Sequence, residues 1–178
     1  MEVLAKLENS QKLLPSTLKF IDIAGLVKGA SEGQGLGNQF LGHVRSVDAI
    51  AHVVRVFTDS DVVHVDGTID PASDLEVIMT ELMLADLDML ERRLEKSRKL
   101  MRSGDPEVKA ELEMAMSFKE QLSDGKLPQY DQNDPVKCKI AKSLGLLTIM
   151  PAFICANVDE ENFREFGKNE ATKKLLEY

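Results

Sequence analysis

Residues 20–30, whose sequence is FIDIAGLVKGA, decide the fold of this chain. The run from Leu18 to Ile23 is apolar enough to form a buried strand of a parallel sheet. Asp22 lies at the carboxyl end of that run, where a carboxylate can help to hold Mg²⁺ beside phosphate groups. Gly25 has no side chain, so backbone N–H groups can come close to a phosphate there. The stretch predicts a phosphate-binding corner at a sheet edge; an Asp that only caps the next turn is the alternative interpretation.

Two further apolar runs, residues 49–57 and 150–156, are typical of buried strands. Helical stretches separate the runs, and strands that alternate with helices indicate an α/β fold with a parallel sheet. Open sheets of this kind bind ligands at the carboxyl ends of their strands.

Between the second and third runs the pattern changes to long helices. Ser73 and Glu76 form a capping box, and residues 75–102 contain no Gly or Pro. Asp105 and Pro106 then begin a second helix. Apolar residues of the first helix follow the 4-3-4-7 spacing of a coiled-coil seam: Met83, Leu87, Leu90, Leu94 and Met101.

The helical stretch divides the chain into two domains. A short helix starts after Asp134 and stops at Gly145, before the third apolar run. We expect an antiparallel coiled-coil insertion over residues 73–145 and a partial α/β domain formed by residues 1–72 and 146–178. The mixed charges of the insertion are typical of solvated helix faces.

A candidate base-recognition loop, residues 157–160 with the sequence NVDE, directly follows the third run. Guanine-nucleotide proteins carry Asn-Lys-x-Asp at this place, where the Asp carboxylate accepts two N–H bonds from guanine. Here Asn157 is kept, Val158 replaces the Lys and can still pack against a base, and Glu160 fits the guanine edge less well than Asp. The loop predicts a nucleotide site that discriminates weakly against adenine.

His64 is the candidate catalytic histidine. It follows an acidic stretch beyond the second apolar run, on the side where such sheets bind ligands. A histidine there can orient or deprotonate a water molecule. A loop histidine without a chemical role is the alternative, and His52, inside the second run, is expected to be a core residue.

Two stretches of the chain resemble the YchF/Obg-like ATPase family, a translation-factor-related branch of the P-loop NTPases: DIAGLVKGAS over residues 22–31 and GLGNQFL over residues 35–41. The resemblance extends over residues 13–162. It implies a nucleotide hydrolase that cleaves the β–γ phosphoanhydride, prefers ATP to GTP, requires Mg²⁺ and is linked to the ribosome or to stress regulation.

The resemblance also assigns roles to individual residues. Asp22 would hold Mg²⁺ through water, and the Gly25 N–H would meet the γ-phosphate. Leu26 stands where many relatives have a water-orienting Gln, and His64 matches the histidine that is thought to replace it. The implied switch loop contains Leu26, Gly29, Gly33, Gly35 and Gly37.

One motif of the family is not found. The 178 residues contain no G-x-x-x-x-G-K-S/T, whose backbone and Lys bind the phosphates. We therefore expect a chain cut short before that motif and after the base-recognition loop, which alone binds nucleotide weakly and hydrolyses it negligibly. The alternative is a non-catalytic module whose helical hairpin docks on a protein or on the ribosome.

The composition of the chain limits the kinds of partner and ligand that the protein is expected to bind. The net charge of −8 argues against a generally basic nucleic-acid-binding surface, so no sequence-specific DNA binding is expected. No apolar run reaches the ~18 residues that span a bilayer. The two cysteines, Cys138 and Cys155, are far apart and fit no metal-binding spacing. A cytoplasmic protein is the expectation.

Overall fold

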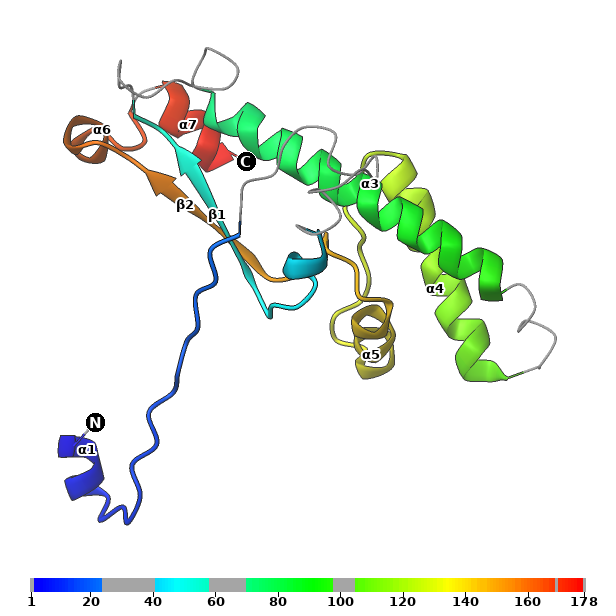
Figure 1. Ribbon diagram of the computed structural model, residues 1–178, viewed down its shortest axis with the longest axis horizontal. Helices are drawn as coiled ribbons and strands as arrows, with labels where there is room; N and C mark the ends of the chain where they lie inside the picture. Colours follow the sequence, from blue (N-terminus) through cyan, green and yellow to red (C-terminus); the bar gives the residue numbers. More distant parts are fainter. Residues whose placement is uncertain (1, 24–40, 58–69, 98–104, 169, 178) are drawn as a thin grey trace.

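The computed structural model describes residues 2–23, 41–57, 70–97, 105–168 and 170–177 (Figure 1). Over these residues the helices and strands are, in chain order, α1 (Glu2–Leu7), β1 (Ile50–Arg55), α3 (Pro71–Ser97), α4 (Pro106–Ser123), α5 (Pro135–Leu144), β2 (Ala152–Asn157), α6 (Glu160–Arg164) and α7 (Glu170–Glu177). Residues 41–44 are also helical. None of the helices described is long and apolar enough to cross a membrane.

β1 and β2 form a parallel pair, as the apolar runs predict. The register places Ile50 opposite Ala152 and Arg55 opposite Asn157. Parallel neighbours need a long crossover connection, and here that connection contains α3, α4 and α5. The α/β class is therefore confirmed.

The first predicted strand, residues 18–23, is a wrong prediction. Residues 11–23 adopt no regular secondary structure and run away from the sheet as an arm (Figure 1). Leu18 and Phe20 are 78% and 75% exposed. An apolar pattern favours a strand only where a neighbouring strand satisfies its backbone groups, and among the described residues no strand pairs with this segment.

The long helix α3 begins at Pro71, earlier than the capping box at Ser73 predicts. Asp70 precedes it, and its Oδ1 accepts a hydrogen bond from the Ser73 N–H at 3.3 Å. That bond lowers the pKa of the Asp70 carboxyl. A proline costs nothing at the first helical position because the N–H there has no partner within the helix. The helix therefore begins at the Asp70-Pro71 pair and not at the capping box of Ser73.

The starts of α4 and α5 are confirmed. Asp105 accepts a hydrogen bond from the Glu107 N–H at 2.9 Å, and Asp134 does the same for the Val136 N–H at 2.9 Å. α5 ends at Gly145, whose φ of 66° lies in the left-handed region that favours glycine.

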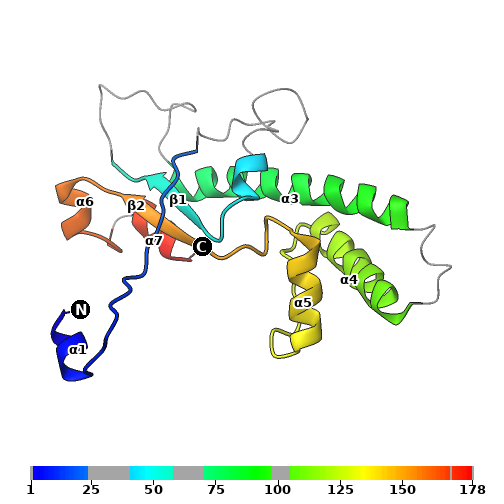
Figure 2. The ribbon, with the colours of Figure 1, turned by 60° about the horizontal axis from the view of Figure 1, so that its bottom comes forward.

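α3 runs from the sheet to α4 (Figure 2) and contributes to three buried clusters along its length. Its first turns pack on the sheet, where Leu75 joins Val54, Val56 and Leu175 in one buried cluster. In its middle, Leu82 and Ala85 join Leu41, Val44 and Leu147. Its later turns pack against α4 and α5 through the predicted seam. The seam residues Met83, Leu87, Leu90 and Leu94 contact a cluster that includes Ala115, Phe118, Leu122, Ala141 and Leu144. Because α5 closes the same core, the helical part is a three-helix packing; the coiled-coil description and the domain boundaries remain predictions.

Candidate functional site

The carboxyl ends of β1 and β2 lie side by side because the two strands are parallel and in register. Arg55 lies opposite Asn157, and the Val56 N–H donates to the Asn157 carbonyl at 2.9 Å. This edge is where open α/β sheets bind ligands. The candidate base-recognition loop therefore leaves the sheet at the expected edge, next to the end of β1.

The candidate base-recognition loop, residues 157–160, has its three candidate side chains in different environments. Asn157 is exposed. Val158 is half-buried and packs against the cluster that contains Val54 and Leu75, so part of its surface is already covered by the protein core. This packing fixes the start of the loop against the sheet while Asn157 faces solvent.

Glu160 is the first residue of α6 and pairs with a residue of the same helix. Its Oε1 accepts a hydrogen bond from Arg164 Nη2 at 2.5 Å, and both side chains are largely exposed. Exposed ion pairs add little stability. A bound base can therefore compete for the Glu160 carboxylate at small energetic cost.

The same edge also carries a positively charged side chain, Arg55, which the sequence motifs did not single out. The Arg55 guanidinium stacks 4.6 Å from the centroid of the Phe57 ring. Its Nε also donates to the Phe57 carbonyl at 3.0 Å. These contacts hold the arginine beside the last residues of β1. An arginine that ends an apolar strand, with an aromatic residue two positions later, was the available signal.

Asp22, the predicted magnesium ligand, is exposed on the arm. Its neighbour Ile23 packs partly against a cluster that contains Leu82 and Leu147. Across the described ranges, no group of three or more His, Cys, Asp or Glu residues is arranged to hold a metal ion. Mg²⁺ is commonly bound by one or two carboxylates together with substrate phosphates and water. An exposed carboxylate such as Asp22 fits such a partial role through a water molecule.

The remaining predicted site residues lie outside the described residues: Gly25, Leu26, Gly29, Gly33, Gly35, Gly37 and His64. His52 is described, and it is half-buried in β1. Burial lowers the pKa of its imidazole, which favours the neutral form. Cys138 and Cys155 are both free thiols.

Asp86 is a buried carboxylate that sequence reasoning passed over. It lies on α3 between Leu82 and Leu90 at a spacing of four residues, and all three side chains are buried. Its carboxylate accepts hydrogen bonds from the Leu147 N–H, the Thr148 N–H and the Thr148 hydroxyl. Burial raises the pKa of Asp86, and these bonds and the nearby Arg45 charge oppose that rise. The sequence signal for Asp86 was an acidic residue at a position where the helical pattern places apolar residues.

The chain is similar to known proteins along nearly its whole length. Residues 4–91 match a family model described as a 50S ribosome-binding GTPase. The chain is 45% identical, over 98% of its length, to the ribosome-binding ATPase YchF of Mycoplasma genitalium. It is 41% identical, over 100% of its length, to the protein of the same name from Bacillus subtilis.

The comparison with solved structures agrees with the sequence comparisons. The structure of the Schizosaccharomyces pombe YchF GTPase matches 99% of this chain with a TM-score of 0.75 and 37% sequence identity. The chain spans about half the length of these relatives: 47% and 49% of the two bacterial proteins and 48% of the yeast chain. Sequence and fold therefore agree that the chain, along nearly its whole length, is similar to about half of a YchF protein.

Proposed function

We propose that this chain contributes to a Mg²⁺-dependent nucleotide hydrolase that cleaves the β–γ phosphoanhydride of ATP in preference to GTP. The observation that carries the proposal is the sheet edge where the Asn157–Glu160 loop leaves β2 beside the end of β1. Relatives named ribosome-binding ATPases support the reaction class and suggest the ribosome, and hence the cytoplasm, as the place of action.

The base-recognition loop would set the nucleotide preference. Asn157 is exposed beside the end of β1 and offers an amide to the base edge. Val158 would pack against the base with the surface that the core leaves uncovered. Glu160 has one more methylene than Asp, which places its carboxylate less well for the guanine N–H groups, so adenine is not rejected.

The phosphate chemistry would depend on the other predicted residues. Asp22 would approach Mg²⁺ through water, the Gly25 N–H would contact the γ-phosphate, and His64 would orient or deprotonate the attacking water. The ion would supply charge neutralisation at the β- and γ-phosphate oxygens. The proposed switch loop contains Leu26, Gly29, Gly33, Gly35 and Gly37.

For these 178 residues taken alone, the proposal is more limited. Since they contain no G-x-x-x-x-G-K-S/T, the backbone cradle and the lysine that dominate phosphate binding are not among them. We expect weak nucleotide binding and negligible hydrolysis from the isolated chain.

A second candidate function is a non-catalytic docking module formed by the helical part. Two ion pairs join α3 to α4: Arg93 with Glu111 at 2.8 Å and Lys119 with Glu91 at 2.9 Å. Together with the buried seam they hold the hairpin as a rigid projection from the sheet (Figure 2). A rigid projection of this kind suits docking on a protein or on the ribosome.

Titration with a fluorescent ATP analogue and its GTP counterpart, with and without Mg²⁺, tests the first function. Asn157→Ala should weaken ATP-analogue binding by roughly threefold to tenfold, the loss expected for one or two hydrogen bonds. Glu165→Ala is the matched control, because Glu165 is an exposed acid shortly after the loop that pairs with Lys168. Equal binding by wild type and Asn157→Ala would remove this residue from the site, and a wild type without any binding would favour the docking module.

A further inference from the structure

Asp86 is an acidic residue at a buried position of α3, where the helical pattern otherwise places apolar side chains. Its side chain is 0% exposed, between two buried leucines of α3. Burying a carboxylate is expensive unless hydrogen bonds compensate it. Here the three donors all come from one short segment: Leu147 N–H at 2.9 Å, Thr148 N–H at 2.8 Å and the Thr148 hydroxyl at 2.8 Å. Among the described residues, the carboxylate is therefore hydrogen-bonded to one short segment only, which lies 61 and 62 residues further along the chain.

That segment belongs to the connection between α5 and β2, residues 145–151. α3 holds this connection at two places. Asp86 binds its middle, at Leu147 and Thr148, and Arg93 Nη1 donates to the Ser143 carbonyl at 3.1 Å in the last turn of α5, just before the connection begins. Leu146 and Leu147 each belong to a buried cluster that includes a residue of α3. The segment that leads into β2 is thus anchored to the helix.

The position of the start of β2 decides the position of its end. β2 has six residues and is an extended strand of about 20 Å that cannot shorten or stretch. Within the described part of the chain it pairs with β1 and with no other strand. A slip by one residue would turn every side chain of the strand to the opposite face. A second attachment outside the sheet therefore helps to fix where the strand ends, and Asn157 is its last residue.

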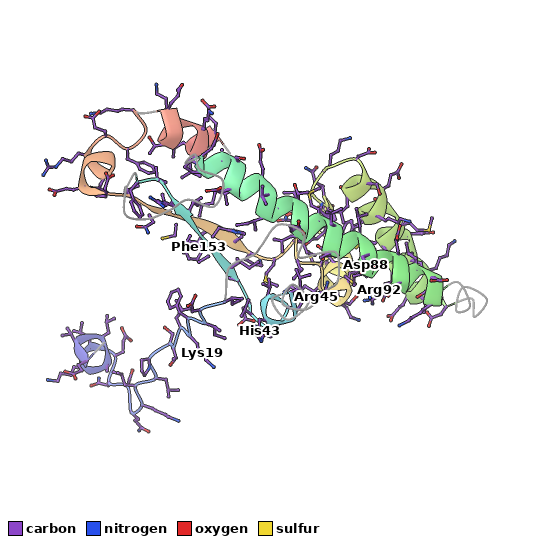
Figure 3. The ribbon with its side chains drawn as sticks, turned by 45° about the horizontal axis from the view of Figure 1, so that its top comes forward. Lys19, His43, Arg45, Asp88, Arg92 and Phe153 are labelled. Atoms are coloured by element: carbon purple, nitrogen blue, oxygen red, sulfur yellow. The ribbon has the colours of Figure 1, made fainter. Side chains whose placement is uncertain are left out.

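We propose that Asp86 is a positioning residue for the Asn157–Glu160 loop: from α3 it locks the segment before β2 and so sets where the loop stands at the sheet edge. This inference rests on the proposed nucleotide function. The effect of Asp86 on the order of the loop can nevertheless be measured without nucleotide. The control position is Asp88, an exposed acid of the same helix that pairs with Arg92 on the surface (Figure 3).

Amide hydrogen exchange followed by mass spectrometry, on the nucleotide-free chain, tests the link. In Asp86→Ala, exchange in residues 147–160 should become about tenfold faster, whereas residues 106–123 of α4 should change by less than about twofold. Asp88→Ala should change neither. A merely structural aspartate would instead speed exchange in both segments together, and that result, or no acceleration of residues 147–160, would overturn the proposal.

A milder variant covers the case in which Asp86→Ala does not fold. Thr148→Val removes one of the three hydrogen bonds and keeps nearly the same shape. It should speed exchange in residues 147–160 by about threefold and leave α4 unchanged. Unchanged exchange in residues 147–160 would again count against the role of Asp86. Titration of the wild type with the ATP analogue then judges the nucleotide function separately, since a chain that does not bind can still show the local exchange pattern.

Discussion

At the scale of single residues, burial decides which side chains respond to pH. His52 is the described histidine whose pKa is shifted, and the shift is downward from 6.5 because burial disfavours the charged ring. The folded protein therefore holds this proton less tightly than the unfolded chain does. The stability that His52 contributes is present above pH 6.5 and is lost as the pH falls through the folded pKa.

The corresponding prediction compares variants at several pH values. His52→Leu should reduce the fall in unfolding free energy between about pH 7 and about pH 5 relative to wild type, because the buried proton-binding group is gone. Urea denaturation at each pH measures it. His43→Leu serves as the control, since His43 is exposed on the helical turn before β1 (Figure 3). A wild-type slope that survives unchanged in His52→Leu would exclude His52 as its source.

At the scale of elements, local patterns identified most helices and strands. β1 and β2 form where the apolar runs predict strands, and α4 and α5 begin at the Asp-Pro pairs that predict their starts. The segment 18–23 has the same apolar character as β2, but no strand lies beside it in the described part of the chain. An apolar pattern without a pairing partner therefore led to a wrong prediction. The role of Asp86 was also out of reach, because it depends on a contact with Leu147, which is 61 residues away.

The seam between α3 and α4 gives the prediction at this scale. Leu90 is 0% exposed and packs with Ala115 and Phe118. Leu90→Ala should lower the free energy of unfolding by about 3–5 kcal/mol, since truncation of a buried leucine removes apolar contacts and leaves a cavity. Leu84→Ala is the matched control, because Leu84 lies on the same helix and is 45% exposed. A similar loss in both variants, seen by chemical denaturation, would argue against the buried seam.

At the scale of the whole molecule, the arm and the sheet both leave large apolar side chains in solvent. Leu18 and Phe20 project from the arm, and Val53 and Phe153 project from one face of the sheet at 68% and 55% exposure. Exposed apolar surface of this kind marks a contact site or a tendency to aggregate.

We predict that self-association depends on the arm. The double variant Leu18→Lys and Phe20→Lys should stay monomeric to about tenfold higher concentration than wild type, because it removes exposed apolar area. Glu8→Lys makes the same change in net charge without removing an apolar side chain, so it is the control. Light scattering over a concentration series measures the difference, and an equal gain from both variants would assign the effect to charge alone.

α3 also determines how the protein can be divided. Its 27 residues form one continuous rod of about 40 Å. Leu75 near its beginning belongs to the core of the sheet, and Leu90 further along belongs to the core of the helices. A cut at the predicted domain boundary near residue 73 would separate Leu75 from the sheet, and a cut further along would expose the seam. We therefore expect the two cores to melt in a single transition, so that neither can be produced as a separately folded fragment.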